Sequence, residues 1–129
     1  MLEVLLATAI LAGTLVPALR LMRDSMIVSR EIEANGLVET YCVGKLEQQL
    51  ALAAGTWTTG IDQGDFAGDG QSQLRFVAVR ADDSASGGIP NRLMAVTVSV
   101  WYDRDGNLAI DPGEPIQSMN SKVAKMAAY

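Results

Sequence analysis

The sequence contains no histidine and a single cysteine, Cys42, among its 129 residues. A Ser-His-Asp triad, a Cys-His pair, a histidine-bearing zinc site and a CxxC redox centre are therefore excluded, and we expect no enzyme. One cysteine cannot form an internal disulfide, which leaves the cellular compartment open. We interpret Cys42 as a small apolar residue on a helix.

Charged side chains are also scarce, at 19% of the residues, and 15 acidic against 10 basic residues give a formal net charge of −5. The lysines and arginines are scattered along the chain, so the sequence has no basic patch for nucleic acid, and we expect no nucleic-acid partner. The length fits one small domain and is too short for two.

The first 19 residues, MLEVLLATAILAGTLVPAL, contain one charged side chain, Glu3. A helix that spans a bilayer needs about 20 apolar residues, so the run is slightly short. A cleavable signal sequence should begin with Lys or Arg, whereas the first charge here is acidic. A buried helix of a soluble protein is the other alternative, but so small a chain cannot surround a helix that is apolar on every face. We expect a membrane or a helical assembly to cover it.

Glu3 lies near the start of this apolar run. An ionised carboxylate in such a place costs several kcal/mol unless it finds a positive partner. No lysine or arginine occurs in the first 19 residues, so the available cation is an α-amino group, either the chain's own or that of a neighbouring copy. The second option would make Glu3 an assembly contact.

The sequence LEVLLATAILAG, followed by Pro17, resembles the N-terminus of type IV pilin-like proteins, whose mature chains begin near FTLxEVLxAxxIL. The resemblance covers about residues 2–22, and Glu3 matches the family glutamate. It implies a prepilin with a short basic leader, cut after glycine by a prepilin peptidase that also methylates the new N-terminus. The subunit would then move from the membrane into a filament, where Glu3 pairs with the terminal amine of the adjoining subunit.

The sequence departs from that pattern at its start. It has no basic leader and no Gly-Phe junction, and Met1 stands about where the third mature residue of the family would be, which indicates a truncated chain. Arg20 and Arg23, taken alone, would favour the opposite orientation in the membrane. The resemblance instead implies a single pass through the bacterial inner membrane, with the C-terminal domain in the periplasm.

Three segments are expected along the chain. Residues 1–22 are a hydrophobic helix for the membrane or filament core, residues 23–54 are its amphipathic continuation, and residues 55–129 form a small antiparallel sheet domain with acidic loops. Gly55 is a natural helix stop. Pro17 lacks a backbone donor and Gly13 lowers helix propensity, so we expect a bend or a locally melted segment there, which the resemblance favours over a plain kink.

Strands are predicted at residues 74–80 and 93–102 from their apolar alternation, and a strand is favoured over a short helix at residues 115–126. Residues 56–72 are rich in glycine and aspartate and predict a surface loop in which Asp62, Asp65 and Asp69 are solvated. The fold class is α+β, with a long N-terminal helix packed on a small antiparallel sheet. This layout is similar to that of minor pseudopilins of type II secretion, I class, and minor type IV pilins, V class.

The segment 103–114, DRDGNLAIDPGE, has the spacing of a twelve-residue loop that surrounds Ca²⁺ with oxygen atoms. The predicted ligands are Asp103, Asp105, Asn107, the carbonyl of Ala109, Asp111 and Glu114. Leu108 stands at the sixth position, where that loop needs glycine. The segment also resembles calcium-binding DxNGNGxxDPGE loops of extracellular β-domains, and the alternative is a metal-free, solvated turn at Asp105 and Gly106.

Two functions follow from these observations. The first is a non-enzymatic minor pseudopilin or minor pilin that helps to initiate or cap a periplasmic filament of a type II secretion or type IV pilus system. Its partners would be other minor and major subunits and the prepilin peptidase, with Glu3, Gly13 and Pro17 serving assembly. The alternative is a single-pass, membrane-anchored module that binds calcium or acts as an adhesin.

Overall fold

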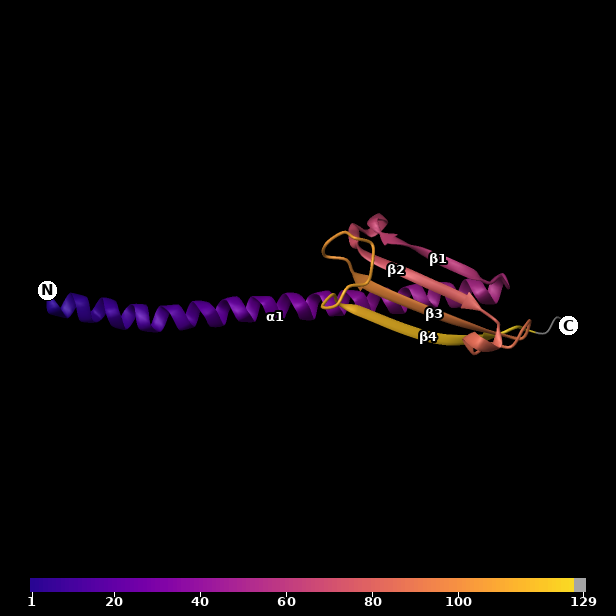
Figure 1. Cartoon of the computed structure of the whole chain (residues 1–129), viewed down its shortest axis with the longest axis horizontal. Coiled ribbons are helices and arrows are strands. Elements are labelled where there is room, and N and C mark those ends of the chain that lie inside the picture. Colours follow the sequence, from indigo (N-terminus) through magenta and orange to yellow (C-terminus); the bar gives the residue numbers. More distant parts are fainter. Residues whose placement is uncertain (127–129) are drawn as a thin grey trace. The chain divides into compact units, whose positions relative to one another are not determined.

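The computed structural model describes residues 1–126. Contacts between residues divide the chain into two compact units, Met1–Glu33 and Ala34–Tyr129. The elements, in chain order, are α1 (Leu2–Gly55), β1 (Gly60–Phe66), the short 3-10 helix η1 (Ala67–Asp69), β2 (Gln71–Ala81), the short 3-10 helix η2 (Ser84–Ser86), β3 (Leu93–Tyr102) and β4 (Ile116–Ala124) (Figure 1).

The unit Met1–Glu33 consists of the first part of α1, and every one of its residues is exposed. The helix is continuous through Gly13 and Pro17, so the expected melted segment is not present in this structure. Two of its four hydroxyl groups are satisfied within the helix, since Thr8 donates to the carbonyl of Val4 at 2.7 Å and Thr14 to that of Ile10 at 3.1 Å. Up to Leu19, α1 therefore offers little polar surface apart from Glu3.

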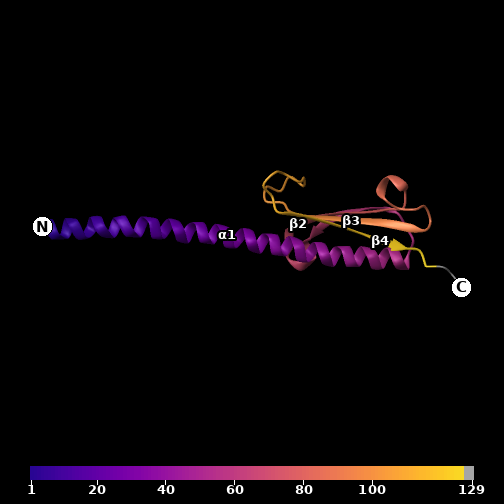
Figure 2. The same cartoon turned by 90° about the horizontal axis from the view of Figure 1, so that it is seen from below.

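The second unit joins the end of α1 to a four-stranded sheet in the order β1-β2-β3-β4. All neighbouring strands are antiparallel. The last turns of α1 run along one face of the sheet (Figure 2). The expected α+β class is confirmed, in a layout consistent with the pilin-like fold, and the prediction that residues 115–126 hold a strand is confirmed by β4.

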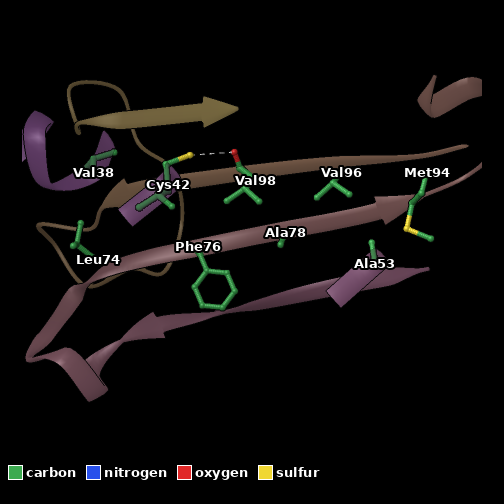
Figure 3. Packing of buried hydrophobic residues seen from close by; sticks show 10 residues of the cluster. Val38, Cys42, Ala53, Leu74, Phe76, Ala78, Met94, Val96 and Val98 are labelled. Carbon is green, nitrogen blue, oxygen red and sulfur yellow. Dashed lines mark hydrogen bonds between the residues drawn. The ribbon is translucent and has the colours of Figure 1, made fainter. Parts of the chain in front are cut away.

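The core lies between α1 and the sheet face that it covers (Figure 3). Strand β3 alternates as predicted, with Met94, Val96, Val98 and Val100 fully buried on the covered face. The helix contributes small side chains to the same cluster, which consists of Val38, Cys42, Ala53, Leu74, Phe76, Ala78, Met94, Val96, Val98 and Val100. Small residues on the helix let the sheet approach closely.

The predicted loop at residues 56–72 is wrong for residues 60–66, which form the edge strand β1, and for residues 71–72, which begin β2. Asp62 and Asp65 lie in this strand and form ion pairs with Arg80 at 3.4 Å and Arg75 at 3.8 Å on β2. The Phe76 ring packs against Gly64, where a Cβ atom would lie 3.4 Å from it, in ordinary van der Waals contact. Cross-strand contacts thus stabilise a segment whose composition is typical of a loop.

Candidate functional site

Two regions carry candidate function, and the first is the surface of the unit Met1–Glu33. All its large apolar side chains are exposed: Met1, Leu2, Val4, Leu5, Leu6, Ile10, Leu11, Leu15, Val16, Leu19, Leu21, Met22, Met26, Ile27, Val28 and Ile32. Helix α1 contains a stretch that is long and apolar enough to cross a membrane. Contiguous exposed apolar surface on this scale marks contact with a membrane or with other protein chains.

The apolar surface continues beyond the uncharged run. Residues 20–33 contain six charged side chains yet still expose large apolar ones. Leu21, Val28 and Ile32 line a shallow hollow on one helix face, together with Ser25. They are spaced four, three and four residues apart with Ser25 between them, the spacing of a helix-packing seam. Charged neighbours disfavour hydrocarbon as the environment of this seam, so another protein surface fits it better.

Glu3 lies in the first turn of α1. A carboxylate there interacts favourably with the helix dipole, which is worth about 0.3–1 kcal/mol. Over residues 1–126 the ion pairs are Asp65 with Arg75 and Asp62 with Arg80, so Glu3 takes part in neither of them. Its charge is available to a cation outside this chain.

No family model, no curated protein and no solved structure matches this chain.

The second region is the loop that connects β3 to β4, which lies on the side of the sheet away from α1 (Figure 2). Its two ends are fixed by backbone hydrogen bonds. The Asp103 N–H donates to the carbonyl of Gln73 at 2.8 Å, and the Tyr102 N–H donates to the carbonyl of Pro115 at 2.9 Å. The loop therefore leaves and re-enters the sheet at defined points.

Three carboxylates of this loop converge. Asp103, Asp105 and Glu114 each offer one oxygen, and these oxygens lie within 4.8 Å of one another. Asp103 is only 3% exposed. Its Oδ2 accepts the Leu108 N–H at 2.9 Å, whereas its buried Oδ1 has no hydrogen-bond partner within residues 1–126. A buried carboxylate oxygen without a donor is costly unless a cation or another donor reaches it.

Two of the other predicted ligands, Asn107 and Asp111, form a hydrogen bond with each other. The side-chain amide of Asn107 donates to the Asp111 carboxylate, and Asn107 Oδ1 accepts the Ala109 N–H at 3.0 Å. Asp111 is therefore engaged within the loop and is not part of the group of three carboxylates. The structure thus unites three of the four predicted carboxylate ligands, from the first, third and twelfth positions of the segment.

Leu108, at the sixth position, adopts a left-handed backbone conformation with φ of 64°. This is the conformation for which the twelve-residue calcium loop uses glycine. A leucine pays roughly 1–2 kcal/mol to occupy it. The backbone thus adopts a left-handed conformation at the sixth position although leucine disfavours it.

Sequence reasoning missed an aromatic groove between α1 and the β1-β2 edge. Tyr41, Phe66 and Phe76 line it, with ring centroids 4.7 Å apart for Tyr41 and Phe66 and 5.3 Å for Phe66 and Phe76. Lys45 Nζ lies 3.9 Å from the Phe76 ring centroid. Burial lowers the pKa of Lys45, partly offset by Asp62. No sequence pattern could have brought these residues together, because the composition of residues 56–72 predicts a loop where Phe66 lies in β1.

Proposed function

We propose that this protein is a non-enzymatic minor pseudopilin or minor pilin that helps to initiate or cap a periplasmic filament of a type II secretion or type IV pilus system. One observation carries the proposal: the unit Met1–Glu33 is a helix whose large apolar side chains are all exposed, with a glutamate in its first turn. The resemblance of residues 2–22 to pilin-like N-termini supports the same function.

An anchor alone needs only the uncharged stretch. The seam of Leu21, Val28 and Ile32 among charged residues favours helix-to-helix contact in addition to a membrane. In this proposal the subunit waits in the inner membrane with its sheet domain in the periplasm, and its N-terminus is processed and methylated by the prepilin peptidase. It then joins other minor and major subunits through this helix.

Glu3 has a specific task in the proposal. Its carboxylate neutralises the terminal amine of a neighbouring subunit inside an apolar bundle, where an unpaired charge costs about 2.5–3.5 kcal/mol. The exposed position of Glu3 and its absence from the ion pairs of residues 1–126 support this task.

The test replaces Glu3 by Gln in the full-length protein, expressed in its source bacterium, and measures the fractions in the membrane and in sheared filaments. We expect an unchanged membrane fraction and a filament fraction reduced roughly tenfold or more, because the neighbouring amine loses its partner. Glu31→Gln is the matched control, since Glu31 is an exposed carboxylate of the same helix outside the apolar run. Equal filament fractions for Glu3→Gln and the wild type would favour the anchored-module alternative.

A further inference from the structure

We propose that Asp103, Asp105 and Glu114 bind one Ca²⁺ ion, which joins the two ends of the β3-β4 loop. The proposal is independent of what the N-terminal helix does. Two separate observations point to it: the three carboxylate oxygens lie within 4.8 Å of one another, and Asp103, which is 3% exposed, has an Oδ1 without a hydrogen-bond partner in the described chain.

The β3-β4 loop carries an excess of negative charge that a cation would balance. Residues 103–114 carry four acidic side chains and one basic one, Arg104, which is exposed. Three carboxylates this close repel one another unless a positive charge lies between them. Two oxygens on opposite sides of a Ca²⁺ ion are about 4.6–5.2 Å apart, so one ion can contact all three groups.

The donor set selects the type of metal. All three ligands are carboxylate oxygens, and no histidine or thiolate is available to favour zinc or copper, since the one cysteine lies in the core. Ca²⁺ accepts six to eight oxygen ligands in irregular geometry, whereas Mg²⁺ demands a near-ideal octahedron. The exposed side of Asp105 leaves room for water to complete the coordination of Ca²⁺.

Binding would tie the end of β3 to the start of β4. Asp103 follows β3 directly and Glu114 stands two residues before β4, so one ion closes the loop. The edge strand β4 then gains a fixed entry point beside Pro115, whose carbonyl accepts the Tyr102 N–H. Trp101, two residues before Asp103 and 3% exposed, places an intrinsic fluorophore next to the site.

The test is a Tb³⁺ titration of the full-length protein in detergent micelles, with tryptophan excitation and competition by Ca²⁺ and by Mg²⁺. We expect saturable Tb³⁺ emission that Ca²⁺ displaces at lower concentration than Mg²⁺. Glu114→Gln should weaken Tb³⁺ and Ca²⁺ binding on the order of tenfold or more, because it removes one of three charged ligands. The variant should still fold, since its amide oxygen can accept the Asp111 N–H that Glu114 accepts.

Asp69→Asn is the matched control, because it removes an exposed carboxylate from η1 and not from the loop. Its affinity should equal that of the wild type. Trp101→Phe should abolish most of the sensitised emission, and Trp57→Phe should preserve it. The proposal is overturned by an absence of saturable emission, by an unchanged affinity in Glu114→Gln, by equal competition from Mg²⁺, or by emission that depends on Trp57 instead.

Discussion

The two parts of helix α1 differ in the size and in the burial of their apolar side chains. Residues 2–33 expose large side chains such as Leu5 and Leu11 and bury none, whereas residues 34–55 bury small ones, among them Ala34, Cys42 and Ala53. In the second part the chain supplies its own cover, and small side chains let the sheet come close. In the first part the cover must come from outside the chain. Helix formation alone therefore does not indicate the role of a helix, whereas the size and the burial of its apolar residues do.

Matched leucine truncations give the largest expected contrast between the two regions. Leu74 is fully buried in the core, and Leu74→Ala should lower the free energy of unfolding by about 2–5 kcal/mol. Leu11 is 58% exposed, and Leu11→Ala should change it by less than about 0.5 kcal/mol. Urea unfolding in detergent micelles, followed by the fluorescence of Trp57 and Trp101, measures both values.

A destabilisation of the sheet domain by Leu11→Ala as large as that by Leu74→Ala would contradict this difference between the two regions. The exposed helix would then be part of the cooperative folding unit. Leu11→Ala should instead weaken retention in the membrane, which a carbonate-wash fractionation detects.

Matched glycine substitutions give a smaller contrast. A Cβ atom on Gly88 would lie 2.7 Å from backbone atoms of Asp82 and from the carbonyl oxygen of Leu93, so Gly88→Ala should destabilise the domain by about 1–3 kcal/mol. A Cβ atom on Gly13 meets nothing within 4 Å. Gly13→Ala should therefore leave the thermal midpoint of the sheet domain unchanged, and a fall like that of Gly88→Ala would contradict the division into two units.

The smallest effect concerns pH and the buried half of α1. Burial raises the pKa of the Cys42 thiol above its ordinary value of 9.0. The unfolded chain therefore loses this proton first, so the stability from the protonated thiol is present below about pH 9 and falls as the pH rises further. Comparing Cys42→Ala with the wild type isolates the contribution of the thiol to the free energy of unfolding. This contribution changes by at most about 1.4 kcal/mol per pH unit. The pKa of Lys45, which burial lowers, is common to both proteins and cancels.

Unfolding curves from pH 8 to pH 10.5 provide the measurement for Cys42. The wild type should lose stability more steeply than Cys42→Ala over this range. Parallel curves, or rapid alkylation of Cys42 in the folded protein, would show that the thiol is not shielded as its position 3.6 Å from the Val98 carbonyl oxygen indicates.

Much of the fold was predictable because its signals are local. The helix ends at Gly55 as predicted, and the alternation of residues 93–102 correctly predicted β3. The preference for a strand near the C-terminus was also correct. Strand β1 was missed, because its glycines and aspartates disfavour a strand by propensity, whereas pairing with β2 and contacts with Arg75, Arg80 and Phe76 stabilise it.

The candidate metal site was predictable in part for the same reason. The spacing of residues 103–114 predicted six ligands for one ion, and the structure brings carboxylate oxygens of three of them, Asp103, Asp105 and Glu114, within 4.8 Å of one another. It could not reveal that Asn107 engages Asp111, or that Oδ1 of Asp103 is buried without a donor among residues 1–126, because both depend on how the loop folds against the sheet.

The sequence by itself determined the long helix, the apolar run of residues 1–22 and the position of Glu3, because periodicity and hydropathy act along a single element. Only the tertiary structure decided the existence of β1, the aromatic groove with Tyr41, Phe66 and Phe76, and the partners of the loop residues. Those features depend on contacts between segments far apart in the chain, and the free energy of such contacts outweighs the weak local preferences of the residues that make them.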